Sequence, residues 1–436
     1  MCLALVVGNM IGAGVFMLPA SLAPYGWNAV FGWIVTIGGG LCLAFTFARL
    51  AQALPQAGGP YAYTRAAFGQ TAGFVVAWAY WISLWVGNAA IATAGIGYLA
   101  VFFPVLDTVP GLPAISACAV IWLFTWINCR GVRAAGGVQM VTTVLKLLPL
   151  IAVVAIAGWM VVDTGGEALM PFDGETIGFG AIGATAAITL WALLGLESAT
   201  IVAHDVEDPQ RTIPRATLWG TAITGLVYLL VCSGVTLLMP VDQAANSNAP
   251  LADFVAASLG SGSGMVVALF AAISAFGALN GWILLQGEMP NAMARDGVFP
   301  AFFATRSRRD TPVRAHIVST ALLTVIVLLN YTRSLADLFT FIALLATTAS
   351  LVAYLACSCA ALALAWRKRM IFTAPAALVA MIAALYSAWT IYGAGAEAAG
   401  WGLVLLLAGI PVHLLMRRKA RTVSGQTTET TAWQSG

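Results

Sequence analysis

The chain has 436 residues, of which 61% are hydrophobic and only 8% are charged, and its mean hydropathy is +0.91. About a quarter of the residues in a soluble domain are charged. This composition therefore excludes a soluble globular protein and predicts a polytopic membrane protein. The formal net charge of +3 is small, and it gives no reason to expect a nucleic-acid partner.

A transmembrane helix needs about 20 mostly apolar residues, and the chain contains twelve apolar stretches of suitable length. They lie at 1–22, 27–53, 71–103, 112–129, 136–162, 179–202, 213–239, 263–290, 314–331, 335–366, 371–394 and 398–416. Each stretch is continuously apolar rather than alternating, which argues against a transmembrane β-barrel. We expect an all-α fold of twelve transmembrane helices embedded in a lipid bilayer.

The charged residues segregate between alternate loops. When the N-terminus is placed in the cytoplasm, all of the 20 Lys and Arg residues except Lys146 and Arg333 fall in or beside cytoplasmic loops. The outer loops carry acidic residues such as Asp107, Asp163 and Glu397. This distribution follows the positive-inside rule, so we expect both termini to be cytoplasmic.

The first span contains the stretch VVGNMIGAGVF (6–16), in which Gly8, Gly12 and Gly14 weaken a helix at mid-membrane. The spacing of Gly8 and Gly12 is also typical of two helices that pack closely. The alternative is a discontinuous helix, whose unwound backbone exposes N–H and C=O groups that need partners. A zwitterionic amino acid offers partners for both.

The sixth span contains TLWALLGLESAT (189–200), with Gly195 at its middle. Its position, five spans after the first, predicts a second discontinuous helix in an inverted repeat. We expect a single transporter domain over 1–422, built from repeats at 1–162 and 179–366 with two further helices at 371–416. Residues 423–436 are polar and predict a disordered cytoplasmic tail.

Two ionisable residues, Lys146 and Glu197, fall deep within predicted spans. A charge at the bilayer centre costs about 2.5–3.5 kcal/mol or more. One interpretation is a structural ion pair or a set of interhelical hydrogen bonds. The other is a coupling or gating site.

Signatures of other function classes are lacking in the sequence. The three histidines show no metal-ligand spacing, and no nucleophile is clustered with a base, so we expect neither a metal, a cofactor nor an enzyme. The sequence contains neither a repeated selectivity-filter motif nor a ring of like charges, so it does not predict a channel. A transporter of a small molecule is the class that remains.

Four stretches resemble a known family. They are GNMIGAGVFMLP (8–19), LPQAGGPYAYTRAAFG (54–69), LWALLGLESATIVAHDVEDPQRTIPRA (190–216) and AMARDGVFP (292–300). The chain resembles the amino acid–polyamine–organocation (APC) superfamily, and within it the basic amino acid/polyamine antiporters. The resemblance is strongest to the arginine/agmatine antiporters, through AYWISLWVGNAAI (79–91) and NGWILLQG (280–287). It implies a LeuT-like fold of two inverted five-helix repeats, with helices 1 and 6 discontinuous.

The resemblance also implies roles for individual residues. Those that would surround the substrate are Met10, Ala13, Gly14, Ser83, Leu84, Asn88, Ile91, Trp191, Leu194 and Trp282. Those at gating or relay positions would be Tyr80, Glu197 and Tyr354.

Elementary chemistry fits this set, because an indole face attracts a desolvated cation by about 2 kcal/mol and a guanidinium group stacks well on it. Tryptophan is also typical of membrane interfaces, and Asn88 could serve only to join two helices.

The chain departs from the arginine/agmatine pattern at several positions. Ala13 and Ala346 stand where that pattern has serine, Ile91 replaces a methionine and Ser83 replaces an alanine. The loss of the hydroxyl at Ala13 removes one donor for a substrate carboxylate. Lys146 replaces a small apolar residue, and proton-coupled amino acid transporters of the superfamily carry a lysine there. Lys146 would therefore bind and release a proton, or replace a sodium ion structurally.

We expect an inner-membrane, alternating-access antiporter that exchanges a basic amino acid such as arginine for its decarboxylated amine such as agmatine. The alternative is a proton-coupled symporter of broader or neutral specificity that uses Lys146. A homodimer is the family expectation.

Overall fold

The computed structural model describes residues 2–54, 59–131, 135–197, 208–330 and 332–417. All regular secondary structure in these ranges is helical. The helices of the first half are α1 (Cys2–Met10), α2 (Gly14–Leu22), η1 (Ala23–Tyr25), α3 (Trp27–Ala53), α4 (Pro60–Phe68), α5 (Gln70–Ala100), α6 (Val105–Thr108), α7 (Leu112–Cys129), α8 (Ala135–Asp163), η2 (Gly174–Thr176) and α9 (Phe179–Ala192). The second half contributes α11 (Pro209–Leu238), α12 (Val241–Ala245), α13 (Pro250–Leu259), α14 (Ser261–Arg295), η4 (Ala301–Ala304), α15 (Val313–Leu329), α16 (Leu335–Trp366), α17 (Ala374–Gly393) and α18 (Gly395–Leu407).

Nine helices in the described part of the chain are long and apolar enough to cross a membrane. The predicted spans at 1–22, 179–202 and 314–331 correspond instead to shorter apolar helices, and the first of these is divided between α1 and α2. The polytopic, all-helical architecture predicted from composition is confirmed. The tail at 423–436 lies outside the described residues.

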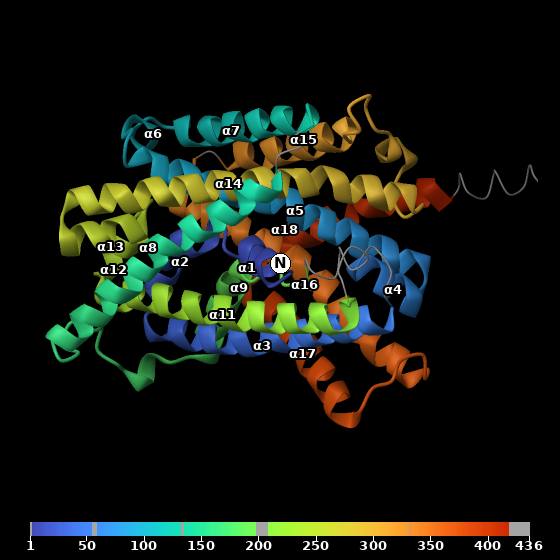
Figure 1. Ribbon diagram of the computed structural model, residues 1–436, viewed down its shortest axis with the longest axis horizontal. Helices are drawn as coiled ribbons and strands as arrows, with labels where there is room; N and C mark the ends of the chain where they lie inside the picture. The colour runs from blue at the N-terminus through green and yellow to red at the C-terminus, as the bar shows by residue number, and fades with distance from the viewer. Residues whose placement is uncertain (1, 55–58, 132–134, 198–207, 331, 418–436) are drawn as a thin grey trace, which may run out of the picture.

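Most helices run along the long axis of the molecule (Figure 1). Helices α7, α14 and α15 lie on one side, and α3, α11 and α17 lie on the other. Helices α5 and α16 pack against each other between these groups. They form the core, because 83% and 78% of their most apolar stretches are buried, against 11% in the segment that contains α18.

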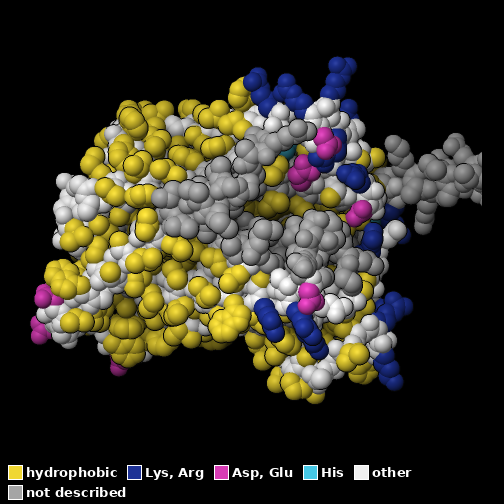
Figure 2. Space-filling model, viewed as in Figure 1, with side chains coloured by type: hydrophobic (Ala, Val, Ile, Leu, Met, Phe, Trp, Pro, Cys, Tyr) yellow, Lys and Arg dark blue, Asp and Glu magenta, His cyan; other side chains and the backbone are white. Residues whose placement is uncertain are grey.

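The surface of the molecule is largely apolar, as contact with lipid requires. Large apolar side chains are widely exposed, including Ile151 at 62% and Leu329 at 66%. Figure 2 shows these side chains covering the flanks, while Lys and Arg gather at one end of the molecule. A soluble protein rarely exposes so large an apolar surface, so these flanks face lipid. The cytoplasmic location of the basic end stays a prediction.

Helix α4, which hydropathy alone did not indicate because it is short and amphipathic, lies across the ends of longer helices. The hydroxyl of Tyr61 donates to Asp296, just beyond α14, at 2.5 Å. Burial and this hydrogen bond raise the pKa of Tyr61 above its usual range, which favours the protonated hydroxyl that donates to Asp296. Arg367, at the end of α16, donates to the carbonyl of Ala67 at 2.6 Å. These bonds fix α4 at the basic end of the bundle.

We predict that Gly393→Ala destabilises the bundle, because a Cβ at Gly393 would lie 2.2 Å from the carbonyl oxygen of Gly183 on α9. Overpacking of this kind costs roughly 1–3 kcal/mol. Thermal unfolding of the detergent-solubilised protein should show a lower midpoint. The matched control is Gly400→Ala, because nothing lies within 4 Å of a Cβ at Gly400. Equal midpoints for the two variants would contradict the close approach of α9 and α17.

Candidate functional site

The first helix is interrupted between α1 and α2. Helix α1 ends at Met10 and α2 begins at Gly14, so Ile11–Ala13 is not helical. The first N–H groups of α2, those of Gly14 and Val15, have no acceptor within their own helix. They give this end of α2 a partial positive charge. The glycine pattern that predicted either close packing or a break coincides with a break.

A second interruption lies opposite the first. Helix α9 ends at Ala192, and Leu193–Glu197 forms turns in which Gly195 has φ +98°. That backbone conformation favours glycine strongly. The two interruptions touch, because a Cβ added at Gly14 would lie 2.7 Å from Cζ3 of Trp191. The remainder of the predicted sixth span, from residue 198, lies outside the described residues.

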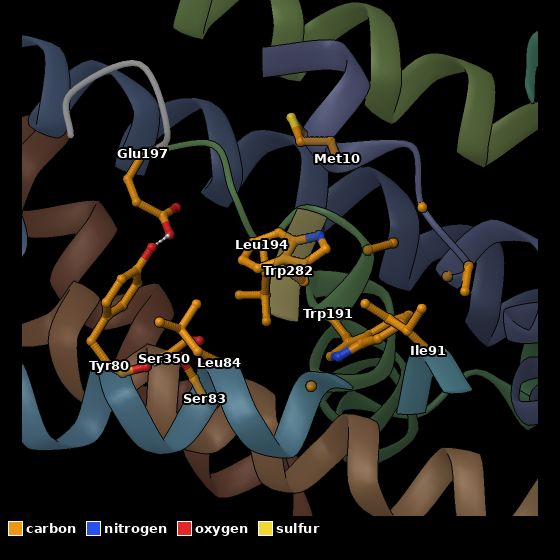
Figure 3. A pocket seen from close by; sticks show the side chains of 15 residues that line it. Met10, Tyr80, Ser83, Leu84, Ile91, Trp191, Leu194, Glu197, Trp282 and Ser350 are labelled. Atoms are coloured by element: carbon orange, nitrogen blue, oxygen red, sulfur yellow. Dashed lines mark hydrogen bonds between the residues drawn. The ribbon is translucent and has the colours of Figure 1, made fainter. Parts of the chain in front are cut away.

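A cavity opens where the two interruptions meet α5, α14 and α16. Its empty volume is about 530 Å³, part of which is open to solvent. Its lining is mostly apolar, and α5 supplies one wall through Tyr80, Ser83, Leu84 and Ile91 (Figure 3). The residues that line it are Met10, Gly12, Ala13, Gly14, Tyr80, Ser83, Leu84, Gly87, Ile91, Trp191, Ala192, Leu194, Glu197, Trp282 and Ser350.

Nine of the ten residues predicted to surround a substrate line this cavity, and Asn88 is the exception. Among the residues that prediction missed is Ser350, on α16. Three hydroxyl residues close together in the middle of an apolar span, Thr347, Thr348 and Ser350, were the signal that could have indicated it. Trp191 is held in place by an edge-to-face contact with Phe339, with ring centroids 5.1 Å apart. The structure thus brings nine predicted residues around one cavity, but their positions alone do not identify the ligand.

Glu197 is buried at one side of the cavity and is clamped by two tyrosines. The hydroxyl of Tyr80, on α5, donates to Oε1 at 2.7 Å, a bond drawn in Figure 3. The hydroxyl of Tyr354, on α16, donates to Oε2 at 2.6 Å. The side chain of Glu197 is 1% exposed. The end of the interrupted sixth span is thereby tied to the two core helices.

Asn88 lies behind the cavity wall rather than in it. Its side chain is fully buried on α5, and Nδ2 donates to Oε1 of Gln286, on α14, at 2.7 Å. Asn88 therefore does not line the cavity in this conformation, and its contact with a substrate side chain stays a prediction. Its bond to Gln286 joins α5 to α14, which is the alternative role considered for Asn88 from the sequence, although the partner could not be predicted there.

Lys146, on α8, is not part of the cavity lining. Its side chain is only 2% exposed, and within the described ranges it forms no ion pair. Helix α8 packs against α1, α11 and α14. Lys146 is thus separate from the cavity, on a helix that contacts α1, the first half of the interrupted first span.

Comparison with known proteins agrees with this architecture. Residues 2–407 match the amino acid permease family. The chain belongs to that family. Within the APC superfamily it falls among the basic amino acid/polyamine antiporters, and it is a transporter rather than an enzyme. The family inferred from the sequence motifs is confirmed.

Named relatives cover most of the permease. It is 35% identical to a cadaverine/lysine antiporter of Escherichia coli over 78% of this chain and 77% of that protein. It is 35% identical to a putative arginine/ornithine antiporter of Bacillus subtilis over 81% of each. It is 32% identical to a putrescine transporter of Haemophilus influenzae over 92% of each.

We predict that Tyr354→Phe lowers the stability of the permease by roughly 1.5–3 kcal/mol, the usual worth of a hydrogen bond to a charged group. The change leaves one carboxylate oxygen of Glu197 without this donor in a buried setting. Thermal unfolding in detergent measures the effect. The matched control is Tyr386→Phe, whose buried hydroxyl donates to a neutral acceptor, Thr36, at 3.3 Å. A larger loss for Tyr386→Phe would argue against the clamp.

Proposed function

We propose that this permease exchanges a basic amino acid for its decarboxylated amine by alternating access across the inner membrane. The observation that carries the proposal is the cavity between the two interrupted helices, which brings Trp191 and Trp282 beside the N-terminus of α2. Relatives named for lysine and cadaverine, arginine and ornithine, and putrescine support the same substrate class.

Each end of such a substrate has a complementary feature in the cavity. The carboxylate suits the free N–H groups at the start of α2. The α-amine suits the carbonyl end of α9, which carries partial negative charge. The cationic side chain suits the indole face of Trp282. We assign Ser83, Leu84, Ile91 and Leu194 to the walls, and the Tyr80–Glu197–Tyr354 clamp to a gate.

The proposed transport cycle uses the inverted repeats at 1–162 and 179–366 as two bodies that move around this site. Arginine with agmatine is the substrate pair that the motifs favour. Lysine with cadaverine is the pair in the name of one relative, and ornithine with putrescine joins the ornithine of a second name to the putrescine of a third. Proteoliposomes of purified protein distinguish them.

The expected result is uptake of one labelled basic amino acid that requires its own amine inside the vesicle and proceeds without a proton gradient. The three pairs are tested in parallel, with glycine-loaded vesicles as the control for leakage. Uptake into empty vesicles driven only by an inward proton gradient would replace exchange by symport. Lack of any uptake of the three amino acids would remove basic amino acids from the proposal.

A proton symporter is the second candidate, and the burial of Lys146 without an ion pair in the described chain favours it. A buried amine that gains and loses a proton during the cycle would couple transport to the gradient. In that case Lys146→Met, which keeps the length of the side chain, abolishes gradient-driven uptake. If exchange is correct, the same variant retains amine-dependent uptake.

We predict that Trp282→Leu weakens binding of the cationic substrate by roughly 10- to 30-fold, because a desolvated cation–π contact contributes about 2 kcal/mol. Isothermal titration in detergent measures the affinity. The control is Trp159→Leu, since Trp159 is 56% exposed on the lipid-facing flank of α8. Equal affinities for the wild type and Trp282→Leu would refute the contact.

A further inference from the structure

A chain of buried polar side chains runs from the back of the cavity wall to the far side of the bundle. Asn88 Nδ2 donates to Gln286 Oε1 at 2.7 Å, and Gln286 Nε2 donates to Thr320 Oγ1 at 3.0 Å. The hydroxyl of Thr320 lies 2.8 Å from that of Thr125. The chain joins α5, α14, α15 and α7, and each of its members is at most 2% exposed.

One atom of this chain has no partner. Oδ1 of Asn88 is buried and makes no hydrogen bond within the described structure. An unsatisfied buried acceptor costs roughly 1–3 kcal/mol, so it needs an explanation. Such an atom is a ready acceptor for a donor that arrives from outside the protein.

The position of Asn88 places it beside the cavity. Leu84 and Ile91, which line the cavity, are four residues before and three residues after Asn88 on the same stripe of α5. Gln286 likewise follows Trp282 by four residues on α14. The spacing therefore puts the Asn88–Gln286 pair on the same helix stripes as the lining residues Leu84, Ile91 and Trp282, one helical turn away.

Gln286 is the residue bonded to the Asn88 amide. In this structure its Nε2 donates to Thr320, and its Oε1 accepts from Asn88 Nδ2. The carbonyl oxygen of the Asn88 amide, Oδ1, is therefore the atom that remains without a hydrogen-bond partner. If both amides were reversed, the end left over would be the NH₂ group, a donor, which would favour a neutral carbonyl-bearing substrate instead.

We infer that Gln286 is a positioning residue for substrate selectivity, which orients Asn88 so that its free acceptor serves the cationic head of the substrate and not a neutral analogue. This inference rests on the proposed function. Gln286 acts through Asn88 and does not line the cavity. Selection arises because the acceptor forms a charge-assisted hydrogen bond with a guanidinium or ammonium group but only a weaker, neutral one with a ureido or amide group.

The test is a double-mutant cycle of Gln286→Met and Asn88→Ala, read as the ratio of affinities for a cationic amino acid and its neutral analogue. The probes are arginine with citrulline and lysine with norleucine, titrated against purified protein in detergent. We expect Gln286→Met to lower the ratio for arginine over citrulline by roughly 10-fold, as for loss of a charge-assisted hydrogen bond. In the Asn88→Ala background the same change should leave the ratio unaltered.

Two further measurements keep the inference distinct from a loss of folding. Gln286→Glu retains an acceptor toward Asn88 and should retain the wild-type preference for the cation, and thermal unfolding reports the integrity of each variant. An undiminished ratio in a folded Gln286→Met variant, or an equal effect of Gln286→Met with and without Asn88, would overturn the inference. Failure of the wild type to bind either arginine or lysine would instead overturn the proposed function.

Discussion

The structure depends on one constraint, which is that a peptide group inside a membrane must have a hydrogen-bond partner. The interruption at Ile11–Ala13 creates groups that the helix cannot satisfy. The protein itself satisfies neighbouring carbonyls, because Tyr228 donates to the carbonyl of Met10 at 2.7 Å and Tyr98 donates to that of Phe16 at 2.6 Å. The N–H groups at the start of α2, by contrast, have no acceptor in their own helix and border the cavity. Two carbonyls on either side of the interruption are thus bonded by tyrosines of other helices, while these N–H groups border the cavity.

The buried core helices α5 and α16 hold the sixth span in place beside this cavity. Helices α5 and α16 are the most buried long helices among those described, and each sends a tyrosine to Glu197 at the end of the interrupted sixth span. A movement of that segment must either carry these two bonds along or break them. A buried carboxylate with two charge-assisted bonds favours one arrangement strongly. The clamp therefore resists displacement of the segment from the position that it has in this structure.

Much of this fold was readable from sequence because the bilayer imposes simple rules. Hydropathy gave the long helices, and glycines in mid-span gave both interruptions. Helices α4 and α13 were not indicated, because nine or ten residues are too few to span a membrane and carry no comparable signal. The cavity lining followed largely from family motifs. The pairing of Asn88 with Gln286 did not, because the residues are 198 positions apart and spacing along one helix says nothing about which side chain faces it from another.

In the proposed exchange, one cavity must bind both an amino acid and its decarboxylated amine with similar affinity. The two differ in the carboxylate, so every contact made only to the carboxylate widens the gap between their affinities. In the proposed exchange the side chain of Ala13 adds no such contact, and the carboxylate meets only backbone N–H groups that the interruption leaves free in any case. Contacts to the cationic head, by contrast, are common to both substrates. If recognition is concentrated on Trp282 in the lining and on Asn88 behind it, as proposed, and is sparse at α2, the two affinities come closer together, and this is what exchange in both directions requires.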